Sequence, residues 1–149
     1  MQTFLPYASF AESAKVLDFK RLGKQRVECK QILITLGCCV GEHQGNLQSR
    51  WRNHPAVRMW RGYEPFLVDY AKAICAEWIV RGYKDTLYDQ FQKLRIDLRD
   101  TTSARPLWLG EALLHATHRS NLLRKLPSHY GQFGWVEHSE MAYEWPVGL

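Results

Sequence analysis

A single carboxylate, Glu28, stands within the most basic stretch of this 149-residue sequence. Residues 20–30 (KRLGKQRVECK) hold five of its twenty Lys and Arg side chains. On a helix, five polar side chains of this region repeat at spacings of three, four and seven and share one face: Arg21, Lys24, Gln25, Glu28 and Gln31. Such basic groups bind phosphates, and a carboxylate among them can transfer protons. The pattern alone favours the plainer alternative, a solvated face with Lys24 and Glu28 as an i,i+4 pair.

A second basic group begins at Arg50-Trp51-Arg52, which alternates an indole with guanidinium groups. It continues through Asn53-His54-Pro55 to Arg58 and Arg61. Aromatic and guanidinium groups stack on nucleobases and contact phosphates. The alternative, a helix start with exposed arginines, is favoured when this group is considered by itself.

The third group lies near the C-terminus and consists of His115, His118, Arg119, Arg124 and Lys125. Two histidines at i,i+3 could bind a metal, but no nearby carboxylate or cysteine completes a site, so no metal is expected. Cations at a helix C-terminus also have a structural explanation in the helix dipole.

Composition narrows the classes of protein without selecting one. Hydrophobic residues make up 46% and charged residues 23%, which is ordinary for a globular domain, and the net charge of +5 is compatible with a nucleic-acid partner. No apolar run is long enough to span a bilayer, and the first residues lack a signal-peptide pattern, so neither a membrane nor export is expected. The four cysteines form no CxxC pair and are expected to be reduced thiols. Phosphate-loop, GxSxG and HExxH motifs are absent.

Helical periodicity dominates the chain. Ser9 is expected to cap a first helix, with Glu12 completing a capping box. Asp18 is expected to cap a second helix that runs to about Leu36 and stops at Gly37. Its inward positions are predicted to be Phe19, Leu22, Cys29, Leu33 and Leu36. Gly23 in mid-helix costs up to ~1 kcal/mol relative to Ala, and it could let another group approach the backbone closely.

The remaining segments follow the same logic. Residues 41–53 are predicted to be a surface loop. Pro55 is expected at N1 of a short helix ending near Gly62, and Pro65 opens a longer helix with Gly82 at C′. Leu87, Phe91, Leu94 and Leu98 repeat at helical spacing, and residues 99–106 are a predicted loop. A last helix is expected over roughly 109–125, ended by Pro127, with these positions inward: Leu109, Leu113, Ala116, Ser120 and Leu123. The tail, with Trp135, Tyr143 and Trp145, is predicted to be coil packed over the helices. We therefore expect one compact all-α domain over residues 1–149.

The sequence resembles the pyrimidine-dimer DNA glycosylase family, the small phage endonuclease V type and its bacterial relatives. The likeness spans about residues 1–130 and rests on the order of several short motifs: Leu17-Asp18-x-Lys20-x-Leu22 with Glu28 six residues later, His54, Glu64-x-x-Leu67, Ala76-Glu77 through Arg81-Gly82-Tyr83, and Pro127-Ser128-His129-Tyr130. The resemblance implies a bifunctional glycosylase and abasic-site lyase. In that family the N-terminal α-amine attacks C1′, the base leaves, a Schiff base forms, and β-elimination breaks the strand with the help of a glutamate.

The α-amine suits this chemistry because its reference pKa is about 7.7–8.0, against about 10.4 for lysine, so far more of it is unprotonated at neutral pH. The sequence departs from the phage type at position two, where Gln2 replaces threonine and its bulk should prevent removal of Met1. Either Met1 itself carries the nucleophilic amine, or the chemistry is altered or lost. Val27 and Gln31 also stand where the phage type has arginines.

The expected catalytic groups are the amine of Met1 and the carboxylate of Glu28, with Lys20 or Lys24 as alternative nucleophiles. The expected DNA contacts are Gln2, Arg21, Lys24, Gln25, Arg26, His54, Arg58, Arg119, Arg124 and Lys125. The resemblance implies no cofactor. The expected partner of this monomer is duplex DNA with a damaged, modified or abasic site, in the cytoplasm of a bacterium or of a phage host. The alternatives are a non-catalytic DNA-binding protein, and a nuclease or glycosylase acting on modified DNA or RNA.

Overall fold

The structure, a computed structural model, describes residues 1–101 and 104–147. Helices dominate this part of the chain, which contains no strand and only one isolated bridge, between Val40 and His43. The prediction of an all-α fold is confirmed. The elements are α1 (Phe10–Val16), α2 (Phe19–Thr35), α3 (Pro55–Arg58), α4 (Glu64–Val80), α5 (Tyr88–Asp97), α6 (Ala112–Lys125), α7 (Pro127–Tyr130) and the 3-10 helix η1 (Gly131–Phe133).

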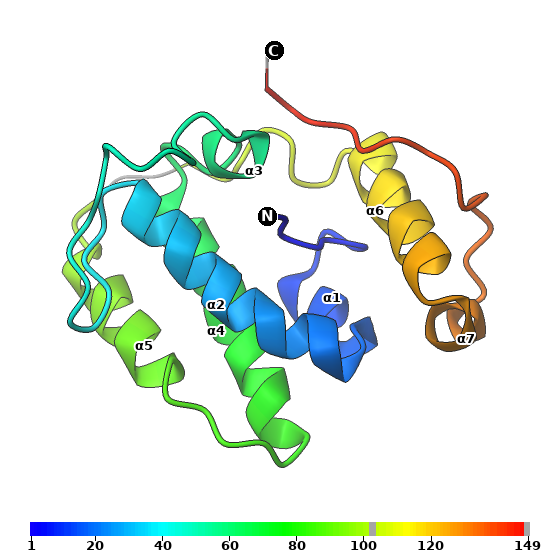
Figure 1. The fold of residues 1–149 in the computed structure, drawn as a ribbon, viewed down its shortest axis with the longest axis horizontal. Coiled ribbons are helices and arrows are strands. Elements are labelled where there is room, and N and C mark those ends of the chain that lie inside the picture. Colours follow the sequence, from blue (N-terminus) through cyan, green and yellow to red (C-terminus); the bar gives the residue numbers. More distant parts are fainter. Residues whose placement is uncertain (102–103, 148–149) are drawn as a thin grey trace.

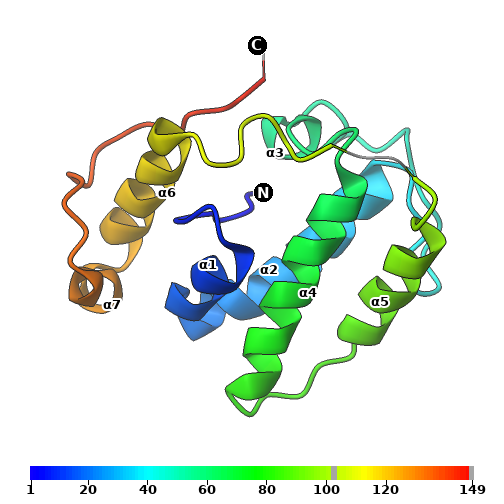
Figure 2. The same ribbon diagram turned by 180° about the vertical axis from the view of Figure 1, so that it is seen from behind.

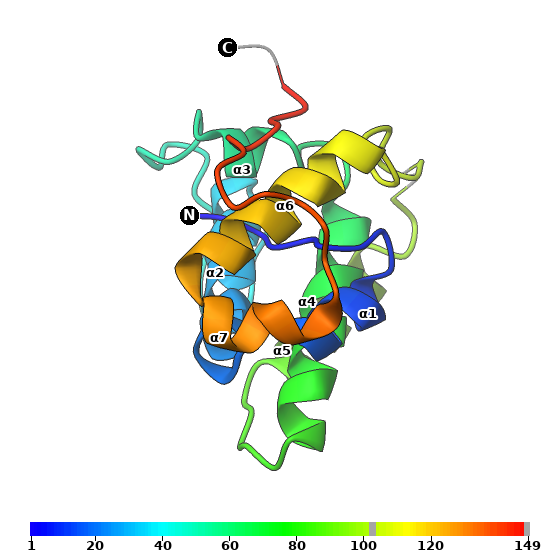
Figure 3. The same cartoon turned by 90° about the vertical axis from the view of Figure 1, so that its right-hand side faces the viewer.

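The core forms where α2 crosses α4 (Figure 1). Leu22, Ile32 and Leu33 of α2 are fully buried there, as are Leu67 and Ile74 of α4. Helices α1 and α5 pack on α4, as the view from behind shows (Figure 2). Helix α6 lies apart from this group, and the N-terminal segment runs between α6 and α2 (Figures 1 and 3).

The caps of the first two helices are those the sequence predicts. Ser9 Oγ accepts the Glu12 backbone N–H, and Asp18 accepts the backbone N–H of Arg21. Gly37 and Gly82, with φ of +96° and +94°, follow the ends of α2 and α4. Residues 41–53 form the predicted surface loop, and the tail is coil apart from η1. Residues 102–103 of the predicted 99–106 loop lie outside the described residues.

Some local predictions are wrong. Helix α3 ends at Arg58, and turns carry the chain on to Gly62. Pro127 follows the end of α6 but also begins α7, a helix that the sequence did not indicate. Phe19 is 53% exposed because it occupies the first position of α2, beyond the reach of α4.

The inward face of α6 is also rotated from the predicted one. Leu113 is 53% exposed, whereas Leu114, His115, His118 and Leu122 are buried. Of the predicted inward positions, Leu109 and Ser120 are buried. The helix begins at Ala112 instead of 109. Polar side chains face inward because the buried neighbour of this helix is a stretch of irregular backbone, whose polar groups need hydrogen-bond partners.

Gly23 does admit a close neighbour, and the neighbour is Trp78 of α4. A Cβ at Gly23 would lie 2.9 Å from two carbons of the Trp78 ring. That ring is itself held between the Arg26 guanidinium, 4.6 Å from its centroid, and the stacked Tyr83 ring at 4.2 Å. The glycine therefore serves the packing of α2 against α4.

We expect Gly23→Ala to lower the free energy of unfolding by about 1–3 kcal/mol, because the trapped indole cannot yield to the added methyl group. The gain in helix propensity offsets up to ~1 kcal/mol of this. Urea titration followed by circular dichroism measures the change. The matched control is Gly131→Ala, where φ is −64° and an added Cβ meets nothing within 4 Å. Equal stability of the two variants would contradict this account of Gly23.

Candidate active site

The first six residues run through the interior as irregular backbone, and side chains from three helices satisfy its polar groups. From α2, Glu28 Oε2 accepts the Gln2 N–H at 3.0 Å. Gln25 Oε1 accepts the Phe4 N–H at 2.9 Å, and Gln25 Nε2 donates to the Gln2 carbonyl at 2.8 Å. From α4, the Tyr70 hydroxyl lies 2.6 Å from the Phe4 carbonyl. These hydrogen bonds fix the backbone from Gln2 onward, directly after the terminal amine of Met1.

Helix α6 holds the same segment from the other side. The Leu5 N–H donates to His118 Nδ1 at 2.8 Å, and His115 Nδ1 donates to the Leu5 carbonyl at 2.8 Å. Arg119 Nη1 donates to the Pro6 carbonyl at 2.7 Å. His115 and His118, whose spacing alone could have suited a metal, therefore hold the backbone of the N-terminal segment as a clamp. Among the described residues, no group of three or more His, Cys, Asp or Glu side chains could hold a metal ion.

These contacts require both histidines to be neutral. His118 Nδ1 accepts a hydrogen bond, so it carries no proton, and His115 Nε2 likewise accepts the Gly110 N–H. Burial lowers the pKa of His118 to about 3, with His115 and Arg119 adding to the effect. Burial also lowers the pKa of His115. The clamp is therefore intact at neutral pH.

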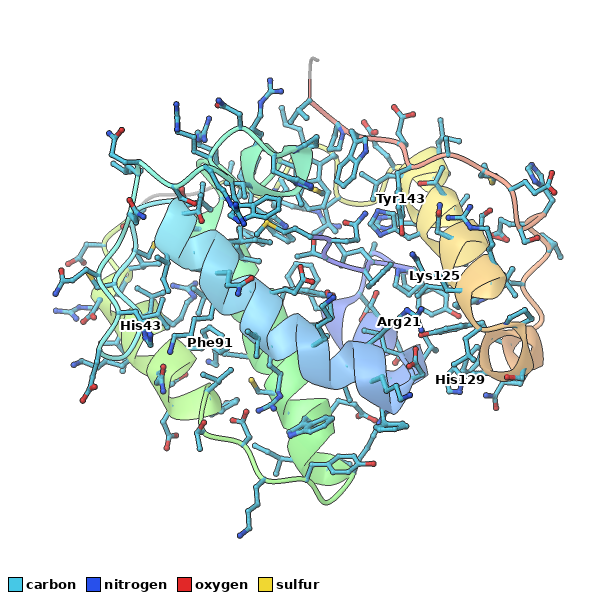
Figure 4. All side chains as sticks on the ribbon, in the orientation of Figure 1. Arg21, His43, Phe91, Lys125, His129 and Tyr143 are labelled. Atoms are coloured by element: carbon cyan, nitrogen blue, oxygen red, sulfur yellow. The ribbon has the colours of Figure 1, made fainter. Side chains whose placement is uncertain are left out.

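A cavity of about 470 Å³ opens where α2, α6 and the N-terminal segment meet. We call it the cationic cavity. It is lined by Met1, Gln2, Phe4, Lys20, Arg21, Lys24, Gln25, Glu28, Lys125 and Tyr143. Figure 4 shows Arg21 of α2 and Lys125 of α6 approaching each other, with Tyr143 of the tail nearby. Four basic side chains thus surround one carboxylate.

Charge in the cationic cavity is unbalanced. Glu28 is 8% exposed and lies 3.6 Å from the Lys24 ammonium. Arg21 pairs with Asp18 at 3.1 Å, and no ion pair among the described residues involves Lys20 or Lys125. Partial burial lowers the pKa of Lys125, as do the nearby charges of Arg21, Arg124 and Lys24. An anion bound here would relieve that repulsion.

A second cavity of about 530 Å³, the loop cavity, adjoins the first and shares Met1, Lys24 and Glu28 with it. Its other lining residues come from the end of α2 and the following loop: Gln31, Ile34, Thr35, Asn46, Ser49, Arg50 and Trp51. The N-terminal residue and Glu28 therefore stand between a strongly basic cavity and one of mixed polar and aromatic character.

The structure separates the predicted DNA contacts into groups. Arg21, Lys24 and Lys125 line the cationic cavity, and Arg124 lies beside Lys125. Gln2 and Gln25 are buried in its wall and hold the backbone. His54 lies near the N-terminal amine: burial and that amine lower its pKa, and Glu28 opposes the effect. Its Nδ1 accepts the Ala56 N–H and caps α3.

Three predicted contacts are not brought to the cavity. Arg26 pairs with Asp85 under the Trp78 ring, and Arg119 pairs with Glu137. Arg58 lines a separate cavity with Trp108 and Pro146. These three arginines therefore do not contribute to the surface around Met1 and Glu28.

Sequence reasoning missed the structural role of α6 and the tail. Tyr143 completes the cavity wall, and burial raises the pKa of its phenol. The side-chain nitrogen of Gln2, Nε2, is buried without a hydrogen-bond partner in the described chain, although this side chain lies close to the Tyr143 hydroxyl. A signal for a polar neighbour was available in 109–125, where Thr117, Ser120 and Asn121 accompany the two histidines, but it does not specify which face turns inward.

A comparison of the sequence with models of known protein families gives a match. A family model described as pyrimidine dimer DNA glycosylase matches residues 1–90. The chain belongs to this family. No curated protein and no solved structure matches it. The match to the glycosylase family covers Met1, Glu28 and the α2–α4 core, while α6 and Tyr143 lie beyond it. This glycosylase-family chain has no helix among its described residues that could cross a membrane.

We expect the clamp to make stability pH-dependent. The pKa of His118 is lowered in the folded state, so its contribution is complete above pH 6.5 and is lost as the pH falls toward 3. Each such histidine makes the free energy of unfolding change with pH by at most about 1.4 kcal/mol per pH unit. His118→Asn keeps an acceptor for the Leu5 N–H but cannot titrate. The slope of the unfolding free energy between pH 6 and 4 should therefore fall by up to about 1.4 kcal/mol per pH unit.

Urea titrations at several pH values measure this slope. His43→Asn, at an exposed loop position, is the matched control and should keep the wild-type slope. The same slope in the wild type and in His118→Asn would show that His118 does not govern acid stability.

Proposed function

We propose that this chain excises a damaged or modified base from duplex DNA and then cleaves the abasic strand, with the α-amine of Met1 as nucleophile and Glu28 as general acid and base. The observation that carries the proposal is the bond from the Gln2 N–H to Glu28 Oε2. It places the carboxylate one peptide unit from the terminal amine, at the border of two cavities. Membership of a glycosylase family supports the substrate class.

Each step of the proposed reaction uses groups at this border. The Met1 nitrogen attacks C1′, the C1′–N bond to the base breaks, and the departing base takes a proton. The nitrogen now bonded to C1′ gives up one proton. The C1′–O4′ bond then breaks and O4′ takes a proton, which leaves a protonated imine between the Met1 nitrogen and C1′. Glu28 removes a proton from C2′, the C3′–O bond breaks, and the phosphate leaves. General acid–base assistance of this kind contributes roughly 10²–10⁴-fold.

The cationic cavity supports the choice of a polyanionic substrate. Lys20, Arg21, Lys24 and Lys125 face one carboxylate, and phosphates would balance the excess positive charge. We propose that the backbone on one side of the lesion lies here. We further propose that residues 1–149 act as one monomeric unit, since α6 and the tail complete a cavity that α2 begins.

Borohydride trapping on a duplex with an abasic site tests the nucleophile. The wild type should form a covalent adduct whose tryptic map carries the modification on Met1. Acetylation of the α-amine, or an N-terminal extension, should abolish the adduct while leaving DNA affinity within about threefold. The intact mass of the unmodified protein shows whether Met1 is retained.

An adduct that survives this blockage would move the nucleophile to a lysine, with Lys20 and Lys24 the first candidates and Lys125 lining the same cavity. Tight binding without any adduct would reject the lyase and leave a DNA-binding protein on the same fold. Competition with duplex RNA distinguishes a protein that acts on RNA from one that acts on DNA.

Glu28→Gln tests the role of the carboxylate. The glutamine Oε1 can still accept the Gln2 N–H, so we expect an intact fold and wild-type DNA affinity. Loss of the proton acceptor should lower single-turnover strand cleavage at an abasic site by roughly 10²–10⁴-fold. Glu42→Gln, at an exposed loop position, is the matched control. Undiminished cleavage by Glu28→Gln would reject the proposed role.

A further inference from the structure

Trp51 is the most exposed of the six tryptophans, all of which the structure describes. It is 42% exposed, whereas Trp60 and Trp108 are buried in the core. A single exposed apolar side chain is common on a protein surface, but an aromatic one that lines a cavity can contact a bound ligand. Trp51 lines the loop cavity together with Met1 and Glu28.

The position of Trp51 is fixed before any ligand binds. The backbone N–H of Trp51 donates to Ser49 Oγ at 3.2 Å, and its backbone carbonyl accepts the His54 N–H at 2.9 Å. The indole meets the His54 ring edge-on at 5.8 Å between centroids. His54 is in turn fixed as the cap of α3. An aromatic surface held in this way loses little conformational entropy on binding.

Arg50 adds a cation to this surface. Its guanidinium carbon lies 5.1 Å from the centroid of the Trp51 ring, and Arg50 forms no ion pair with a described residue. Guanidinium groups stacked on aromatic rings are suited to contact phosphate and base planes together. The pair therefore offers a planar apolar group and a free cation side by side.

The two cavities differ in charge. The loop cavity contains Lys24 and Arg50 against Glu28, while amide and hydroxyl side chains, including Gln31 and Asn46, supply hydrogen-bonding groups. A cavity of about 530 Å³ with this lining fits a neutral, planar, hydrogen-bonding group better than a run of phosphates. A nucleobase has those properties, since every base has a π-face that stacks on aromatic side chains.

We propose that the Trp51 indole is the stacking surface for a nucleobase that is unpaired at the lesion, and that Arg50 binds the adjacent backbone phosphate. This inference rests on the proposed function. It assigns discrimination between damaged and intact duplex to the loop cavity, and covalent chemistry to Met1 and Glu28.

Affinity measurements test the assignment. The probes are one duplex with a tetrahydrofuran abasic analogue, which cannot form an imine, and the same duplex undamaged. Trp51→Ala should weaken binding to the analogue duplex by roughly 5- to 150-fold, the range that stacking on one base gives. Its affinity for the undamaged duplex should change less than twofold. Trp51→Phe keeps a smaller ring and should recover most of the loss.

The matched control is Leu47→Ala, because Leu47 is 64% exposed in the same loop and does not line the cavity. Leu47→Ala should prefer the analogue duplex over the undamaged duplex by the same factor as the wild type. Arg50→Gln should reduce the slope of log affinity against log salt by about one, whereas Trp51→Ala should leave that slope unchanged.

Equal discrimination by Trp51→Ala and Leu47→Ala would overturn the assignment, even where the wild type still traps abasic DNA. Failure of the proposed Met1 chemistry would give a different result. A wild type that discriminates through Trp51 but forms no borohydride adduct would refute the Met1 chemistry and support the stacking surface. A wild type that binds both duplexes equally would overturn the Trp51 assignment directly.

Discussion

The structure depends on hydrogen bonds to the buried backbone of the N-terminal segment. Residues 2–6 enter the interior without a neighbouring strand or a helix of their own, so no regular ladder can accept their N–H and carbonyl groups. Unpaired, each would cost about 1–3 kcal/mol. Side chains supply the missing partners, with Gln25 and Glu28 on one side and His115 and His118 on the other. The same contacts that pay for burial also fix the terminal residue.

This constraint explains why polar residues occupy positions that a helix normally gives to apolar ones. Gln25 is 2% exposed in the middle of α2, and both histidines of α6 are buried. It also explains why α6 lies apart from the α2–α4 core (Figure 1). A helix that binds irregular backbone through side chains stands where that backbone runs, and the space left between α6 and α2 becomes the cationic cavity.

Prediction from the sequence succeeded where local physics decides the outcome. Ser9, Asp18 and the glycines after α2 and α4 act through caps and positive φ, which neighbouring residues determine. The sequence likewise puts Arg21, Lys24, Gln25 and Glu28 on one face of α2. The favoured prediction that this face is solvated is wrong at Gln25 and Glu28, which are buried against the N-terminal segment. The rotation of α6 could not be predicted, because apolar periodicity assumes an apolar neighbour. The partners of Arg26 could not be predicted, since nothing in the sequence indicates that Asp85 and Trp78 meet it from distant positions.

The bond between Gln2 and Glu28 also bears on the departure at position two. In phage-type relatives the nitrogen of residue two is the terminal amine. Here that nitrogen is an amide, it is buried, and its proton is committed to Glu28 at 3.0 Å. An amide nitrogen in this position cannot attack C1′, so a reaction at this site needs the amine one residue earlier, on Met1. Met1 borders both cavities, so in the proposed reaction a retained first methionine would present its amine to the space where the substrate would lie.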